Sequence, residues 1–214
     1  MFNFAIVMEI FNEKQTQILQ VAEKLFAEKG FDGTSIREIS KQSDVNVAMV
    51  SYYFGSKEKL LESLIVHRTA DLKNSLEHII DENLNPIQKI EKFIKLNIER
   101  INNNRDFHHI LLFEISSKKR TMDFESFNGI KKANINSLEK IIIEGQSLNI
   151  FRKDINIHLI IPTILGTYFY FQMHKTFLGD ILSLNTDEKY NQYIKNDLTN
   201  HIQQTIKSLL LYAN

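Results

Sequence analysis

Apolar residues recur at helical spacing along most of the chain, beginning near residue 14. Over residues 14–29 they fall on one face and polar residues on the others, which predicts an amphipathic helix. The apolar face comprises Ile18, Ala22, Leu25 and Phe26. Gly30 stands where a left-handed terminating residue belongs, and Phe31 can fold back onto the last turn. The pattern therefore predicts that this helix ends at Gly30.

Two short helices are predicted next. Thr34 or Ser35 can cap the first of them, and Ser35 with Glu38 fits a capping box. Residues 43–46 break the pattern, and Asn46 can cap a further helix over 47–54. Two helices of about two turns around a four-residue turn are the parts of a DNA-binding helix-turn-helix, whose second helix enters the major groove.

The rest of the chain also has helical periodicity. A helix from Ser56 to about Ile80 is expected to connect the first part of the chain to the second. The further predicted helices span about 87–102, 107–117, 124–148, 156–178 and 187–212. Asn149 can take the left-handed position at the end of the third of these.

The last predicted helix has a continuous apolar stripe at four-residue intervals. The stripe comprises Tyr190, Ile194, Leu198, Ile202, Ile206 and Leu210. The preceding helix is rich in aromatic residues over 168–171. Such a pair of helices is what a two-chain helical interface requires. We therefore expect a homodimer formed through the last two helices.

Composition supports an all-α fold, because the 214 residues include only 7 Gly and 2 Pro. The chain has no Cys, which excludes disulfides and Cys-ligated zinc. His108, His109, Glu114 and His174 show no i, i+4 ligand pair, so neither a metal nor a cofactor is expected. The net charge is zero, so any DNA binding must come from a local arrangement of residues.

No targeting or membrane segment is predicted. The apolar residues 1–11 lack a basic leading region and a small-residue cleavage site. The apolar stretch 159–171 is shorter than a membrane helix and contains Pro162 and Gly166. We expect a cytoplasmic protein. Met8 is a second possible initiator, so residues 1–7 are expected to be dispensable for DNA binding.

About fifty residues closely resemble the signature of the TetR (tetracycline repressor) family. The resemblance runs through residues 30–39, 45–48 and 51–60, with every spacing kept. Two positions depart from it, since the turn usually reads Ala-Gly where this chain has Ser43-Asp44, and a Gly common in the recognition helix is Ala48. The resemblance implies a helix-turn-helix domain over 12–72, with the motif itself at about 35–54. It also implies a helical effector-binding and dimerisation domain over 73–214.

The resemblance also implies which side chains contact DNA. Phosphate contacts are expected from Thr34, Tyr52, Tyr53 and Lys57. Ser35, which can cap its helix, is also expected among the DNA-binding residues. Residues expected near base edges are Arg37, Asn46, Val47, Ala48 and Ser51. A dimer would place its two recognition helices about 34–36 Å apart, which requires a palindromic operator on double-stranded DNA.

A small-molecule effector is expected to bind in the C-terminal domain. Its binding is expected to release the protein from DNA. Ligand cavities are mostly apolar and aromatic, so the candidate lining residues are large apolar side chains. They are Phe93, Phe107, Phe113, Phe124, Phe127, Tyr168, Phe171, Met173 and Phe177. Aromatic residues at helical spacing are more often core residues, so each of these is also a candidate for the core.

Two other classes of function are considered. A helical ligand-binding or adaptor protein that has lost DNA binding is conceivable, because Asp44 lies in the turn and acidic residues slightly outnumber basic ones over 12–72. Salt-sensitive binding to a defined duplex separates this class from a repressor. An enzyme is not expected, since the chain has no phosphate-binding Gly-rich loop, no nucleophile elbow and no recognisable catalytic constellation.

Overall fold

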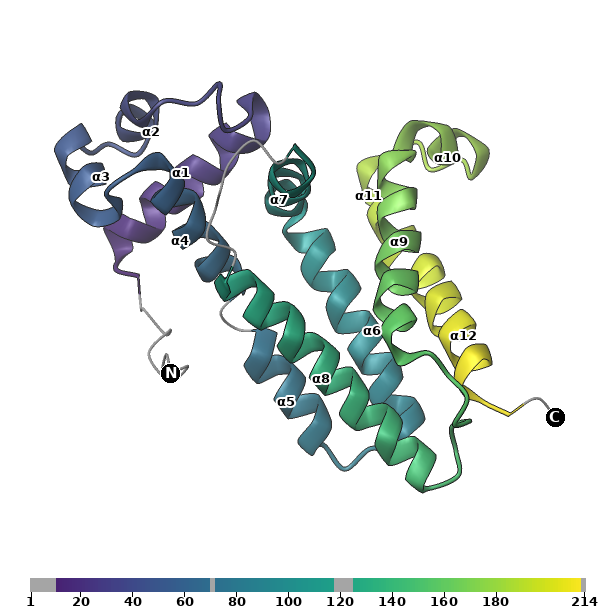
Figure 1. Ribbon diagram of the computed structural model, residues 1–214. Coiled ribbons are helices and arrows are strands. Elements are labelled where there is room, and N and C mark those ends of the chain that lie inside the picture. The colour runs from purple at the N-terminus through teal and green to yellow at the C-terminus, as the bar shows by residue number, and fades with distance from the viewer. Residues whose placement is uncertain (1–10, 70–71, 118–124, 213–214) are drawn as a thin grey trace. The chain divides into compact units, whose positions relative to one another are not determined.

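The computed structural model describes residues 11–69, 72–117 and 125–212, and within these ranges the chain is built from helices (Figure 1). The helices form two compact units. The first consists of residues 1–72 and 104–131, and the second of residues 73–103 and 132–214. The all-α architecture predicted from the sequence is thereby confirmed.

The first unit contains five helices with described positions. They are α1 (Glu13–Lys29), α2 (Ile36–Gln42), α3 (Val47–Phe54), α4 (Lys57–Thr69) and α7 (Arg105–Ser117). Buried apolar side chains of all five form one core. In Figure 1, α2 lies beside α1, and α3 packs against α2 and α4.

The ends of α1 follow from local sequence. Asn12 and Gln15 form a reciprocal capping box at its start. At its end Gly30 has a φ of 72°, a region that residues with a Cβ rarely adopt. The Phe31 ring stacks on Phe26 with ring centroids 5.2 Å apart. The predicted end at Gly30 and the return of Phe31 onto the last turn are both confirmed.

Helix α7 belongs to the first unit although it lies far along the chain. Its residues Phe107, Ile110 and Leu111 are at most 4% exposed and share the core of α1. The sequence pattern placed this segment with the C-terminal helices, and the packing instead adds it to the helix-turn-helix unit. Phe107 is thus a core residue of the first unit.

A partly buried ion pair joins α1 to α4. The guanidinium of Arg68 donates to the carboxylate of Glu23 at 2.8 Å from Nε and 2.5 Å from Nη2. Burial raises the pKa of Glu23, and it outweighs the lowering effect of Arg68; the nearby Asp106 also raises this pKa. The charge of Arg68 therefore offsets part of the desolvation cost of the ionised Glu23 carboxylate.

Arg68→Ala should cost more stability at pH 7 than at pH 4. Without Arg68 the folded-state pKa of Glu23 rises further above its unfolded value of 4.5, so the penalty grows as pH rises through this window. We expect a loss of about 2 kcal/mol at pH 7 and less than about 1 kcal/mol at pH 4 in urea unfolding. Lys59→Ala, which breaks the exposed pair with Glu62, is the control and should cost under about 0.5 kcal/mol at both pH values. Equal losses for Arg68→Ala at the two pH values would contradict the prediction.

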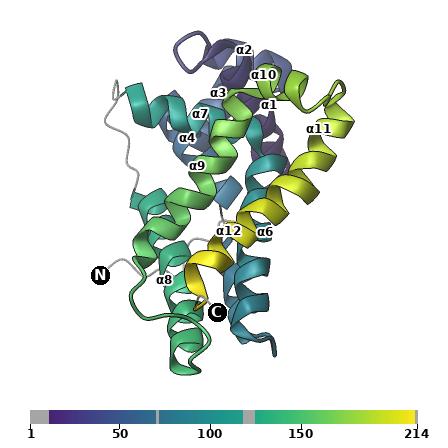
Figure 2. The same ribbon diagram turned by 90° about the vertical axis from the view of Figure 1, so that its right-hand side faces the viewer.

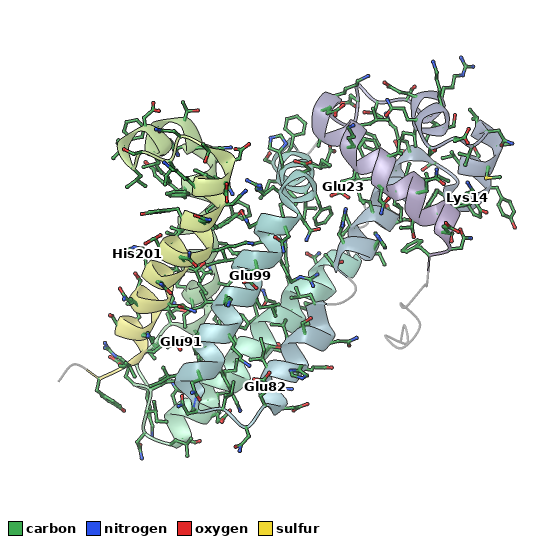
Figure 3. All side chains as sticks on the ribbon, turned by 180° about the vertical axis from the view of Figure 1, so that it is seen from behind. Lys14, Glu23, Glu82, Glu91, Glu99 and His201 are labelled. Carbon is green, nitrogen blue, oxygen red and sulfur yellow. The ribbon has the colours of Figure 1, made fainter. Side chains whose placement is uncertain are left out.

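The second unit contains the remaining helices. They are α5 (Leu72–Asp81), α6 (Pro86–Asn103), most of α8 (Glu125–Ser147), the short η2 (Ile157–Leu159), α9 (Ile160–Met173), α10 (Lys175–Ile181), α11 (Asp187–Tyr193), the π-helical stretch η3 (Ile194–Leu198) and α12 (Thr199–Leu210). Figure 2 shows α9 and α12 side by side, with α6 next to α12. Glu91 of α6, labelled in Figure 3, accepts a hydrogen bond from Nζ of Lys207 in α12 at 2.6 Å.

The predicted helices are close to those observed, with three differences. The helix expected over 187–212 consists of α11, the π-helical η3 and α12, and it ends at Leu210. The helix expected over 156–178 consists of η2, α9 and α10, with an interruption at His174. The helix expected over 56–80 is described as α4 and α5, and residues 70–71 between them lie outside the described residues. Asn149 has a φ of 55°, as predicted for the residue that follows α8. Residues 1–7 also lie outside the described ranges. Within those ranges, no helix has the length and apolar character needed to cross a membrane.

Candidate DNA-binding site

Capping side chains fix the two helices of the helix-turn-helix. Oγ of Ser35 accepts a hydrogen bond from the amide of Glu38 at 3.2 Å at the start of α2. Oδ1 of Asn46 accepts from the amide of Met49 at 2.7 Å at the start of α3. Each cap satisfies an amide that lacks a partner within its own helix. The capping box expected at Ser35 forms only in part, because the Glu38 carboxylate is paired with Lys29.

The turn between α2 and α3 depends on a left-handed residue. Ser43 is fully buried, and its hydroxyl donates to the carbonyl of Ile39 at 2.7 Å. Asp44 follows with a φ of 51°. The Val45 amide then donates to the Ser40 carbonyl at 3.0 Å, which closes the turn. Asp tolerates this backbone region better than most residues, yet Gly adopts it with less strain.

Substitutions of Asp44 should separate backbone strain from charge. Asp44→Gly is expected to raise the free energy of unfolding by about 0.5 kcal/mol, and Asp44→Ala to lower it by about 1 kcal/mol. Asp44→Asn tolerates the same φ, so it should change stability little and strengthen DNA binding by removing a negative charge. Urea unfolding and DNA titration measure the two effects. An Ala variant as stable as the parent would show that the left-handed φ carries no strain.

One face of α3 is exposed and uncharged. Val50 and Phe54 anchor the helix in the core of the first unit, and half-buried Tyr53 packs against the same core. The opposite face presents Val47, Ala48, Ser51 and Tyr52. Val47 is 41% exposed and Tyr52 is 83% exposed, although both are large apolar or aromatic side chains. A single helix face that leaves such residues in solvent is typical of an interaction surface.

Thr34 and Lys57 hold the loop between α1 and α2. The Thr34 side chain is buried, and its hydroxyl donates to the carbonyls of Gly30 at 2.9 Å and Leu25 at 3.1 Å. Nζ of Lys57 donates to the carbonyls of Phe31 and Thr34, each at 2.8 Å, and lies 4.3 Å from the Phe31 ring centroid. In this structure the Thr34 hydroxyl thus bonds to the protein's own backbone, and its contact with phosphate stays a prediction. Lys57 retains one N–H for a phosphate after its two loop contacts.

The structure brings most of the remaining predicted residues to the exposed part of the same unit. Ser35 and Arg37 are exposed on α2, and Asn46 is exposed at the start of α3. Lys41, which the sequence analysis did not single out, is also exposed on α2. Because α3 itself has no basic residue, positive charge for phosphate contacts has to come from other elements, such as Arg37 and Lys41 of α2 and Lys57 of α4.

The predicted effector residues do not form one group. Phe93, Tyr168 and Phe171 are buried in the second unit. Phe113, Met173 and Phe177 are each more than half exposed, which does not fit the lining of an enclosed cavity within one chain. Phe124 lies outside the described residues, and the same holds for the side chain of Phe127.

A polar network lies among the buried residues of the second unit. Tyr168 donates its hydroxyl hydrogen to Oδ1 of Asn102 at 3.2 Å, and Nε2 of Gln172 donates to the Tyr168 oxygen at 2.8 Å. Nδ2 of Asn134 donates to Oδ1 of Asn97 at 3.0 Å. Within the described part of the chain, Oδ1 of Asn134 is buried and has no hydrogen-bond partner. Asn97 recurs in the sequence at helical spacing with Phe93, Ile94 and Ile101, and a polar residue on this apolar face is the one local signal of these contacts.

The apolar stripe of the last helices points into the chain's own core. All six of its residues, from Tyr190 to Leu210, are at most 6% exposed within the second unit. The stripe is therefore part of the chain's own core, and the homodimer expected through the last two helices stays a prediction that needs another face. Along η2, α9 and α10 the exposed apolar side chains are Leu159, Tyr170, Met173, Phe177 and Ile181. Leu182, Leu209 and Tyr212, further along the chain, are exposed as well.

Known proteins share both parts of this architecture. Residues 18–64 match the model for bacterial regulatory proteins of the tetR family, and residues 86–206 match the tetracyclin repressor-like C-terminal domain. The HTH-type transcriptional repressor NicS of Pseudomonas putida is 26% identical over 173 residues, covering 80% of this chain and 82% of that protein.

Two solved structures show the same fold. That of HlyIIR, a hemolysin II transcriptional regulator, is 27% identical with a TM-score of 0.58, covering 94% of this chain and 98% of that one. That of the transcriptional regulator FadR from Bacillus subtilis, in complex with stearoyl-CoA, is 21% identical with a TM-score of 0.64, covering 90% and 97%. Since the two family models together span most of the chain, it belongs to the TetR family of transcriptional regulators, which are DNA-binding proteins and not enzymes.

Proposed function

We propose that the protein is a homodimeric repressor that binds a palindromic operator through α2 and α3 and is released by a small, largely apolar effector. The observation that carries the DNA-binding part is the exposed face of α3. Its residues Val47, Ala48, Ser51 and Tyr52 are held in solvent by a helix whose other face is anchored in the core. Such a face suits the floor of a major groove, where base edges offer both polar and methyl groups.

Selection of bound fragments from genomic DNA tests this proposal directly. A repressor should enrich a site with two inverted half-sites, whose centres are separated by about one helical turn of DNA. Raising salt from 50 to 200 mM should weaken binding steeply, because each phosphate contact releases counterions. No enrichment at any salt concentration would instead favour a ligand-binding or adaptor protein that no longer reads DNA.

The second unit supports a proposal for the chemistry of the effector. Phe93, Tyr168 and Phe171 supply buried aromatic surface, and the unpartnered Oδ1 of Asn134 supplies an acceptor. A buried acceptor without a partner carries a desolvation cost that a ligand donor would remove. We propose an apolar ligand with at least one hydrogen-bond donor. The stearoyl-CoA bound by FadR shows that a protein of this fold can hold a long acyl chain, so acyl compounds are the first to test.

The dimer is proposed to form through the exposed face of α9. Leu159 at the end of η2 and Tyr170 and Met173 of α9 recur at helical spacing, and exposed Gly166 lies on the same face with open space beside it. Exposed Phe177 follows in α10, after the interruption at His174. A small residue in an apolar stripe allows a second helix to approach closely, and two such helices from each chain suit an isologous contact.

Met173→Lys should convert the dimer to a monomer. Met173 is 81% exposed, so the substitution should not disturb the fold, but it places a charge in the proposed contact. We expect the dissociation constant to rise at least about 100-fold in sedimentation equilibrium. Ile143→Lys is the matched control, since Ile143 is 58% exposed on α8 away from this stripe. If both variants, or neither, dissociate, the contact lies elsewhere.

A further inference from the structure

We infer that α3 reads thymine methyl groups, so that the operator half-site has T·A pairs where it faces Val47 and Ala48. The inference rests on the proposed DNA-binding function and specifies which bases this face selects. It begins from the sequence of α3, VAMVSYYF, which has no charged residue. The commonest specific contact, a bidentate Arg or Lys bond to guanine, is therefore not available from this helix.

The polar group at the start of α3 is already engaged. Oδ1 of Asn46 accepts the Met49 amide at 2.7 Å as the helix cap. Bidentate reading of adenine by Asn uses the amide oxygen and the amide nitrogen together. With its oxygen committed to the cap, Asn46 offers its Nδ2 group as a single donor. Its contribution to base discrimination is correspondingly small.

The exposed apolar residues supply the remaining contact chemistry. Val47 is 41% exposed in the first turn of α3, and the exposed Ala48 follows it. The C5 methyl of thymine is the apolar group of the major groove, and it distinguishes T·A from C·G. Burying one methyl group against these side chains stabilises binding by an amount equivalent to about a fourfold change in affinity. Ser51 and Tyr52 can donate or accept, so they discriminate less.

Replacing thymine by deoxyuridine removes the methyl group and keeps Watson–Crick pairing. In the operator obtained by fragment selection, we expect this replacement to weaken binding about fourfold at one or two positions in each half-site. Deoxyuridine in the flanking sequence is the control and should change affinity less than twofold. Circular dichroism of each variant protein checks that it remains folded.

The variant Val47→Ala assigns the effect to a residue. Val47→Ala should weaken binding to the thymine operator, while its binding to the deoxyuridine operator should match that of the parent protein. Independent effects of the two changes would overturn the inference, as would an operator in which every thymine tolerates deoxyuridine. Failure of the proposed function looks different, since no duplex would then be bound selectively by the parent protein, and the inference would fail with it.

Discussion

Ala48→Glu is expected to lower operator affinity at least about 100-fold without destabilising the protein. Ala48 is exposed near the start of α3, on the face that carries Val47, Ser51 and Tyr52. A small residue here allows the helix backbone to approach the base edges closely. Glu would add length and a negative charge beside phosphates, and juxtaposed like charges cost several kcal/mol.

The same substitution suits the isolated helix. Glu is a good helix former, and a negative charge in the first turn interacts favourably with the helix dipole. The free energy of unfolding should therefore change by less than about 0.5 kcal/mol. Gln20→Glu is the matched control, because Gln20 is exposed on α1 of the same unit and the change adds the same charge. Equal losses of affinity in the two variants would mean that overall charge, and not the face of α3, governs binding.

Gly145→Ala is expected to destabilise the second unit by about 3 kcal/mol. Gly145 lies in α8, and a Cβ at this position would come within 2.1 Å of Cδ2 of Phe151. The Phe151 ring is 1% exposed and so has little room to move. The amides of Ile150 and Phe151 both donate to the Gly145 carbonyl, at 2.8 and 3.1 Å, which fixes the chain at this close approach.

Urea or thermal unfolding measures this effect. Gly179→Ala is the control, since the nearest atom to a Cβ there is the carbonyl oxygen of Leu184 at 3.7 Å, an ordinary contact. It should leave stability unchanged or raise it by up to about 1 kcal/mol through lower flexibility of the unfolded chain. The double variant Gly145→Ala, Phe151→Leu should recover part of the loss, because Leu can withdraw from the added methyl group. A stable Gly145→Ala protein would show that Phe151 is displaced without cost.

The helix-turn-helix was predictable because its signals are local. Ser35 and Asn46 cap α2 and α3 through side-chain bonds to amides three residues ahead. Gly30 and Gly55, with φ of 72° and 75°, follow the helices they end. Each of these features acts over a few residues, so it can be identified from neighbours in the sequence alone.

The roles of particular side chains depend on contacts with residues far away in the sequence, which the periodicity of apolar residues does not reveal. Lys57 binds carbonyls 26 and 23 residues away, and Thr34 binds the carbonyl of Leu25, so both side chains have contacts within the protein that their sequence neighbours do not indicate. Phe107 packs against α1 in the first unit, although its own sequence neighbours suggested the C-terminal domain.

The apolar stripe from Tyr190 to Leu210 shows most clearly which properties follow from the local sequence and which depend on tertiary packing. The sequence by itself determined that this segment is helical with one apolar face, because helical period and apolar spacing are properties of the segment. The π-helical stretch η3 and the end at Leu210 were not predicted. The tertiary structure alone decided that this face is buried in its own chain and that Met173 and Phe177 remain in solvent. An apolar face must be covered, but the free energy of burial is non-directional and proportional to area, so it does not specify whether the same chain or a partner covers it.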